Sequence, residues 1–237
     1  MKSLINILLL ISPITLLAQN ADSVKKVLPK EKPSYLPTGI KIGTDAISLV
    51  RWATDESFLG YEANAEIDFY RYYLAMEVGH WDRYFKTAEE NYTNGGNYFR
   101  VGVDVNFLLK DPDKNMFFFG ARYGRSSYSE YFTLTTEDPV WGTVTTKYSN
   151  EYLSAGWGEL TTGLRVKMWK FFWMGYTARL KFGLNSDKPG ELISHDVPGY
   201  GKVDDNNTTW GFNYYLMFRI PFKKDKPIKT ETPVKTD

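Results

Sequence analysis

The chain has 237 residues, with 29 basic against 28 acidic side chains and no cysteine. The absence of thiols excludes disulfide scaffolds, thiolate metal sites and cysteine nucleophiles. The balanced charge argues against a nucleic-acid binder, which needs a basic excess. A negative mean hydropathy excludes a bundle of membrane helices, but not a membrane β-barrel, in which half of each strand is polar.

The first residues have the pattern of a secretory signal peptide: residues 1–18 hold one base, an apolar run and a final alanine. An uncleaved anchor is the alternative, but the run is short and Pro13 interrupts it. Charged, proline-containing stretches follow at 19–38 and 223–237, which we expect to be a flexible periplasmic segment and a flexible polar tail. The folded domain is therefore expected over residues 39–222.

Apolar and polar residues alternate along this domain. From Tyr61 to Phe69 every odd position is apolar and every even position is polar. A helix would spread these carboxylates around its surface, whereas a strand has one apolar and one charged face. A weaker version covers Gly39–Arg51, so the sequence predicts eight strands. The remaining strand patterns are at 72–79, 99–107, 117–124, 159–168, 172–183 and 210–220.

The predicted connections alternate in length, as they do in outer-membrane barrels. Short turns are expected at 70–71, 110–115 and 168–170, and long connections at 85–96, 126–152 and 184–207. The apolar strand faces carry no charged residue, and a lipid-facing Lys or Arg would cost about 2–4 kcal/mol at the bilayer midplane. Alternation alone leaves open a soluble sandwich or lipocalin-like barrel, but the connections favour the membrane barrel.

The opposite strand faces are charged, and the interior of an eight-stranded barrel is just wide enough to be filled by side chains. Acidic strands precede basic ones, so we expect ion pairs across the lumen. The predicted network comprises Glu62, Glu66, Asp68, Glu77, Arg100, Asp104, Arg122, Glu159, Arg165, Arg179, Lys181 and Arg219. A narrow polar pore is the alternative interpretation, and it needs continuous water through the lumen.

Aromatic residues gather near both ends of the predicted strands, as two bilayer interfaces select. The expected girdle comprises Phe69, Tyr72, Trp81, Phe107, Trp157, Trp169, Phe172, Trp210 and Phe218. Residues 126–152 are interpreted as two strands extended into a hairpin, with Asp138-Pro139 in the turn. Its aromatic side chains are also candidate anchors for a docking protein, namely Tyr128, Tyr131 and Trp141.

No catalytic, metal-binding or cofactor-binding residue is expected. The two histidines, His80 near the outer rim and His195 in the last long loop, are interpreted as rim and loop residues because no sequence spacing fixes a catalytic serine beside either of them. Neighbouring carboxylates such as Glu62 and Glu66 face the same lumen by geometry, and opposed arginines explain them without acid–base chemistry.

The arrangement resembles the small outer-membrane β-barrel proteins of Bacteroidota over about residues 36–222. The resemblance rests on the signal ending Ala18-Gln19, the opening Pro37-Thr38-Gly39-Ile40 and the closing Phe218-Arg219-Ile220-Pro221-Phe222. The polar tail after the last strand departs from the common pattern. The nearest likeness is to an uncharacterised family of that phylum, so it carries over no catalytic residue, and some small barrels there are accessory parts of assembly or secretion complexes.

The sequence thus predicts an all-β, eight-stranded antiparallel transmembrane β-barrel with short periplasmic turns and long extracellular loops, exported to the outer membrane of a Gram-negative bacterium. We expect a non-enzymatic structural or interaction protein, with an accessory role in an assembly or secretion complex as one form of it. The expected partners are outer-membrane lipid and lipopolysaccharide, and another outer-membrane barrel or a lipoprotein; nucleic acid and cofactors are not expected. An outer-leaflet lipid-modifying enzyme and a narrow porin-like channel are the alternatives.

Overall fold

The computed structural model describes residues 35–222, except 110, 112, 187–189, 191, 193 and 205. The expected signal peptide, nearly all of the expected N-terminal segment and the C-terminal tail lie outside these residues. The described part is almost entirely β-structure with one short helix. Within it, no helix is long and apolar enough to cross a membrane.

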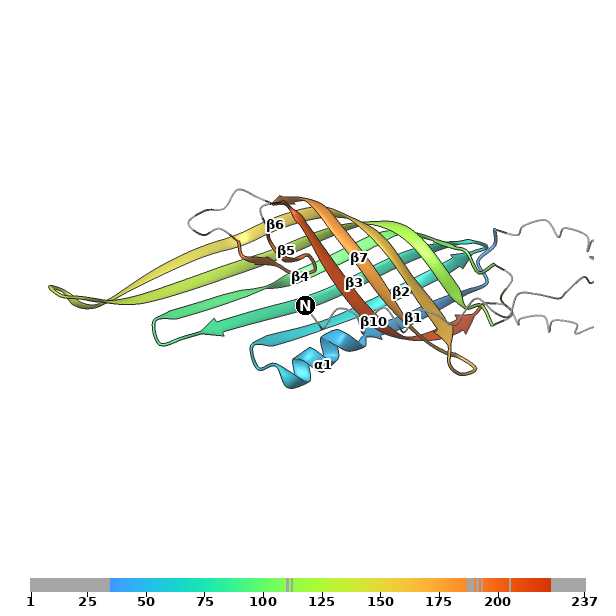
Figure 1. Cartoon of the computed structure of the whole chain (residues 1–237), viewed down its shortest axis with the longest axis horizontal. Helices are drawn as coiled ribbons and strands as arrows, with labels where there is room; N and C mark the ends of the chain where they lie inside the picture. The colour runs from blue at the N-terminus through green and yellow to red at the C-terminus, as the bar shows by residue number, and fades with distance from the viewer. Residues whose placement is uncertain are drawn as a thin grey trace, which may run out of the picture. The chain divides into compact units, whose positions relative to one another are not determined.

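Eight strands form one antiparallel sheet that closes into a ring in the order β1-β10-β7-β6-β5-β4-β3-β2 (Figure 1). The strands are β1 (Gly39–Asp45), β2 (Phe58–Phe69), β3 (Tyr72–Lys86), β4 (Glu90–Asn106), β5 (Met116–Asp138), β6 (Gly142–Lys167), β7 (Phe172–Ser186) and β10 (Thr208–Pro221). The ring closes through β1, which pairs with β2 on one side and with β10 on the other. The paired part of the sheet therefore has no open edge.

The two ends of the ring differ in their connections (Figure 1). At one end, which we call the turn end, short connections join β2 to β3, β4 to β5 and β6 to β7. The other end, the loop end, carries helix α1 (Ala46–Thr54) and a small hairpin formed by β8 (Asp196–Val197) and β9 (Gly201–Lys202). The additional structure is thus concentrated at the loop end.

Helix α1 corrects one sequence prediction. The weak strand predicted over Gly39–Arg51 ends at Asp45, and the chain continues as a helix. The Asp45 carboxylate caps the helix by accepting hydrogen bonds from the backbone N–H groups of Ile47, at 3.3 Å, and Ser48, at 3.2 Å. The ladder between β1 and β10 ends at Asp45 too, so the following backbone groups are satisfied by helical hydrogen bonds instead.

Strands β5 and β6 continue beyond the rest of the sheet as a two-stranded hairpin (Figure 1). They pair with each other as far as Asp138 and Gly142, whereas β4 pairs with β5 only as far as Leu134. The interpretation of residues 126–152 as an extended hairpin is therefore confirmed. The long connection predicted over 85–96 is wrong, because β3 and β4 continue through most of it as strand.

The side chains of the ring have inverted polarity. Outward-facing apolar residues are exposed, as Phe119 and Met76 show at 51% and 52%. Inward-facing charged residues are buried, as Asp104 and Arg165 show at 0% each. Buried apolar clusters are small and lie inside the ring, one of them around Tyr73, Met116 and Phe118. Side chains joined by ion pairs and hydrogen bonds therefore fill most of the interior.

Candidate functional site

The centre of the interior is organised around Glu77 on β3. Its carboxylate meets three guanidinium groups from three other strands. The Nε atom of Arg100 lies 2.6 Å from Glu77 Oε2, and Nη2 of Arg179 lies 2.8 Å from Oε1. Arg122 is also hydrogen-bonded to this carboxylate. One acidic residue thus joins β3 to β4, β5 and β7 across the ring.

A second layer lies towards the loop end, around Glu62. This carboxylate accepts hydrogen bonds from Arg100 and Tyr215, and from the Tyr98 hydroxyl at 2.6 Å. Arg179 links this layer to the centre, because its Nη1 atom lies 2.9 Å from Glu159 Oε2 while Nη2 bonds to the Tyr215 hydroxyl at 2.6 Å. The layers therefore form one connected network.

The turn end of the interior carries further pairs. Arg165 donates to Glu66 Oε1 from Nη2 at 2.9 Å, and Lys41 Nζ lies 4.0 Å from the other oxygen of that carboxylate. Nearer the turns, Arg219 Nη2 lies 3.2 Å from Asp68 Oδ2. Burying a charge is costly unless it is paired, and these pairs distribute the cost over all strands of the ring.

Every residue of the predicted lumen network is buried inside the ring, and all but one form ion pairs with each other. The exception within the described residues is Lys181, whose Nζ donates to the backbone carbonyls of Gly199 and Tyr200, at 2.8 Å each. The prediction omitted Lys41, Tyr98 and Tyr215 from the network. Their position in the strand alternation was the available signal: Tyr98 has the parity of Arg100, Tyr215 has that of Arg219, and Lys41 lies on the polar face of its own strand.

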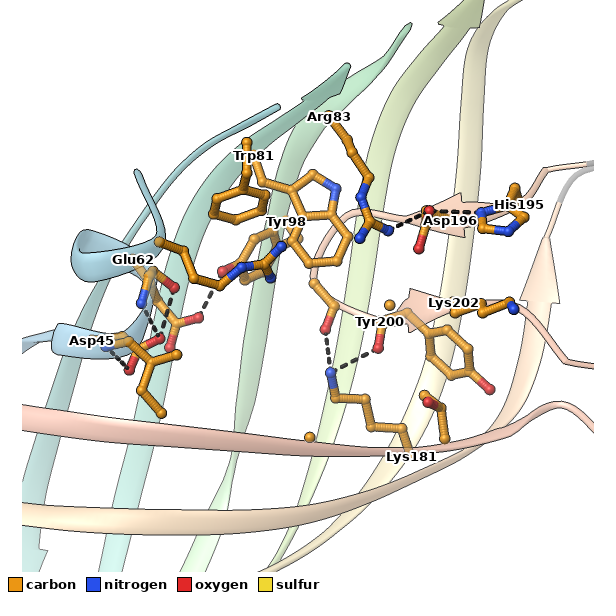
Figure 2. A pocket seen from close by; sticks show the side chains of 18 of the residues that line it. Asp45, Glu62, Trp81, Arg83, Tyr98, Lys181, His195, Asp196, Tyr200 and Lys202 are labelled. Carbon is orange, nitrogen blue, oxygen red and sulfur yellow. Dashed lines mark hydrogen bonds and ion pairs between the residues drawn. The ribbon is translucent and has the colours of Figure 1, made fainter. Parts of the chain in front are cut away.

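The β8–β9 hairpin folds back into the loop end of the ring, and we call Asp196–Lys202 the plug hairpin. Lys181 Nζ donates to two backbone carbonyls of the hairpin (Figure 2). On the other side, Asn94 Nδ2 donates to the Asp196 carbonyl at 2.8 Å. Gly199 has φ +79° and approaches Tyr98 so closely that an added Cβ would lie 2.5 Å from that ring. A glycine is therefore required at the point where the hairpin meets the ring.

A cavity of about 990 Å³ opens between the plug hairpin, α1 and the neighbouring strands. Figure 2 shows Arg83 directed at Asp196, whose Oδ2 lies 2.6 Å from Arg83 Nη1 and 2.8 Å from His195 Nδ1. Asp45 also lines the cavity. Its carboxylate already accepts hydrogen bonds from the first backbone N–H groups of α1 and from Asn213 Nδ2, the latter at 3.0 Å. The lining thus presents aromatic surface and cationic donors, while its acidic groups already have partners.

A polar cluster ties the segment before the plug hairpin to the extended strands. Glu130, fully buried on β5, accepts hydrogen bonds from Asn150 Nδ2 and Ser194 Oγ, at 2.9 Å each, and from the Tyr92 hydroxyl at 3.1 Å. Burial, together with the negative charge of Glu130, raises the pKa of Tyr92 well above its usual range. The phenol therefore stays protonated and acts as a donor.

Two residues of the predicted aromatic girdle are misplaced. Trp157 is 1% exposed inside the ring and donates from Nε1 to Glu159 Oε1 at 2.8 Å. Trp81 faces the cavity beside Tyr98 (Figure 2). Its ring packs edge-on against the rings of Phe58 and Tyr98. Each tryptophan lies an even number of positions from an inward-facing residue of its own strand, so it faces inward as well. The prediction used closeness to a strand end and ignored this alternation. The others lie outside the ring or in its turns: Phe69, Tyr72, Phe107, Trp169, Phe172, Trp210 and Phe218.

The three predicted docking anchors do not share one surface. Tyr128 is only 3% exposed, and its hydroxyl lies 3.0 Å from Ser194 Oγ, so it belongs to the interior. Tyr131 and Trp141 are exposed on the extended hairpin. Tyr128 has the inward parity of β5, which explains the error.

The two histidines lie apart. His80 is on the outer wall, with Nδ1 at 2.9 Å from Asn97 Oδ1 and Nε2 at 3.2 Å from Asp82 Oδ2. His195 is exposed at the mouth of the cavity. Among the described residues no hydrogen bond joins a histidine to a serine, and no group of three or more His, Cys, Asp or Glu residues could hold a metal ion.

The chain belongs to the protein family described as "Domain of unknown function (DUF6048)", whose model matches residues 1–225. No curated protein matches the chain.

Proposed function

We propose that this protein is a non-enzymatic outer-membrane β-barrel with a side-chain-filled lumen, and that it acts as a structural or interaction protein. The observation that carries the proposal is the inverted polarity of the ring. Buried ion pairs inside and exposed apolar side chains outside suit a wall surrounded by lipid. In water, the same apolar outer surface would favour association and aggregation.

The dimensions of the outer face support membrane insertion. On β4 and the residue that follows it, the outward apolar positions run from Phe99 to Phe107. A tilted strand needs about 9–11 residues to cross a bilayer. The ring also satisfies its backbone groups by closing, as a membrane barrel must. The apolar leader and the resemblance to small barrels of Bacteroidota support the proposal of a Gram-negative outer membrane as its location.

The interior favours a structural or interaction role over a channel. Glu77 and its arginines cross the lumen at its centre, and the plug hairpin occupies its loop end. These side chains take the volume that a continuous file of water would need. We therefore expect no conductance in planar bilayers, and steady single-channel currents would instead support the narrow porin-like channel.

The extended hairpin is the part of the fold best suited to a protein partner. Val140 and Trp141 at its tip are 79% and 80% exposed, and Tyr131 lies lower on the same hairpin. Exposed aromatic residues are the usual anchors of protein interfaces. The proposed partner is another outer-membrane barrel or a lipoprotein, as expected for an accessory subunit of an assembly or secretion complex.

The location is tested by fractionating cells that express the tagged chain. We expect it in outer-membrane vesicles after washing with urea or carbonate, with faster gel migration before boiling than after. Recovery in the soluble fraction would contradict the proposal.

The partner is tested by purifying the tagged protein from native outer membranes in a mild detergent and identifying what stays bound in stoichiometric amount. A matched variant replaces residues 137–143 with Asn-Gly, which keeps the pairing of Thr136 with Val144 and removes the hairpin tip. The proposal predicts a stoichiometric partner that the shortened variant loses. Recovery of the barrel alone in both cases would contradict an interaction role.

A third measurement distinguishes the proposed non-enzymatic role from the alternative of a lipid-modifying enzyme. Replacing His80 and His195 together removes both imidazoles of the chain. The proposal predicts an unchanged lipid A profile relative to wild type. A profile that changes on expression of the wild-type chain and reverts in the double variant would support the enzyme instead.

A further inference from the structure

Two hollows in the outer wall of the ring meet at Arg125 on β5. The first, of about 470 Å³, is lined on the side nearer the turn end by Ala63, Val78 and Phe99. The second, of about 400 Å³, lies on the other side of the arginine and is lined by polar and small residues, Ser154 and Asn185 among them. Arg125 lines both hollows, so one cation stands between an apolar groove and a polar one.

The strand register places this meeting point at a boundary. Every side chain of one row across β2 to β5 carries a polar group, the tyrosine through its hydroxyl: Tyr61, His80, Asn97 and Ser127. The next row towards the turn end is Ala63, Val78, Phe99 and Arg125. Below it the wall is apolar apart from the tyrosine hydroxyl, with Ala65, Met76, Val101 and Tyr123. The polarity of the outer face therefore changes within two rows, and Arg125 lies at the change.

The charges around the two hollows favour an anion. No acidic residue among the described ones lines either hollow. The guanidinium of Arg125 reaches only Ser154 Oγ, at 3.2 and 3.3 Å, and forms no ion pair within the described part of the chain. Its neighbour His80 is already held by Asn97 and Asp82. Among the described residues that line the two hollows, Arg125 is thus a cation without an acidic partner.

We propose that these hollows form a binding site for an anionic, phosphate-bearing lipid of the outward-facing leaflet. Arg125 binds the phosphate, for which its forked donors are suited. An acyl chain lies in the groove over Ala63, Val78 and Phe99, and the headgroup enters the hollow beside Ser154. The site rests on the proposed membrane location, because only a lipid-embedded wall brings a headgroup to this boundary.

The site is tested on the full-length protein purified in detergent and stripped of lipid. Phosphatidylglycerol, which has an anionic phosphate, and phosphatidylcholine, which is zwitterionic, are titrated separately, and bound lipids are counted by native mass spectrometry. We expect one tightly bound phosphatidylglycerol per wild-type chain. Arg125→Gln should weaken it by about tenfold or more, as expected for the loss of a charge-assisted hydrogen bond.

Two further variants separate the site from general effects. Ala63→Phe fills the groove without changing charge, and should also weaken phosphatidylglycerol binding. Lys170→Gln removes an exposed cation from the turn end, and should bind as wild type does. Equal binding by wild type, Arg125→Gln and Ala63→Phe would overturn the site.

Membrane insertion is measured separately in each variant, by wash-resistant membrane association and heat-shifted gel migration. Inserted variants with unchanged lipid binding would disprove the lipid site and leave the proposed membrane location intact. A wild-type chain that never enters the membrane would disprove both.

Discussion

The interior and the outer wall of the ring are built from alternate residues of the same strands, yet they are opposite environments. On β3, Glu77 is buried among three arginines, while its neighbours Met76 and Val78 are exposed. On β4, Asp104 is buried between the exposed Val103 and the outward-facing Val105. The comparison shows that strand alternation alone separates charged from apolar side chains. The inward charges need ion-pair partners, and the outward apolar side chains need an apolar environment.

The largest expected effect comes from the centre of the interior. Glu77→Gln leaves three buried guanidinium groups short of one carboxylate, and breaking a buried pair costs about 3–5 kcal/mol. We expect the urea midpoint of unfolding in lipid vesicles to fall strongly. Unfolding is monitored by the heat-dependent shift in gel migration. Glu56→Gln, on the exposed connection before β2, serves as the control. Equal midpoints for the two variants would show that the network does not hold the ring together.

The outer wall gives the next largest effect. Val103→Arg places a charge in the apolar band of β4 and should cost about 2–4 kcal/mol in a bilayer. Val144→Arg, also an exposed valine but on the extended hairpin, should change the stability by no more than about 0.5 kcal/mol. The free energies of unfolding in vesicles provide the measurement. Similar small changes in both would mean that the wall faces water.

A smaller, local effect is expected at the plug hairpin. Gly199→Ala combines an unfavourable left-handed backbone, about 1–2 kcal/mol, with a clash against Tyr98. Gly142→Ala has a similar φ of +72° and no atom within 4 Å, so it carries the backbone cost alone. We expect faster hydrogen exchange across Asp196–Lys202 in the first variant, while the ring strands stay protected. Unchanged exchange there would indicate that Tyr98 does not support the plug.

The smallest effect is expected from an ion pair in water. Lys167 Nζ lies 3.0 Å from Asp113 Oδ1 at the turn end, where both side chains are partly exposed. Lys167→Met should lower the free energy of unfolding by at most about 1 kcal/mol, because solvent screens the pair. A loss as large as that of Glu77→Gln would remove the distinction between interior and surface pairs.

Strand alternation made most of the ring and its interior predictable. The parity that sets Glu62 and Arg100 on the charged face also brings them together, and the extended hairpin follows from its own alternation. The errors at Trp81 and Trp157 came from using position along a strand in place of parity. The helical cap at Asp45 was hidden because the residues after it still fit a weak strand pattern.

The plug hairpin could not be predicted in the same way. Residues 184–207 have no apolar period that fixes a strand or helix. The position of Asp196–Lys202 depends on contacts with Lys181, Asn94 and Tyr98, which are distant from most of the hairpin in sequence. The cavity beside the hairpin is likewise a product of tertiary packing.

The most direct test of the account is a single-cysteine scan of β4 from Val101 to Val105, in a chain that has no native cysteine. A fluorophore attached at each position is measured in vesicles whose lipids carry bromine on their acyl chains. The account predicts strong quenching at 101, 103 and 105, and weak quenching at 102 and 104. Uniform quenching, or none at any position, would contradict a lipid-facing apolar wall around a charged interior.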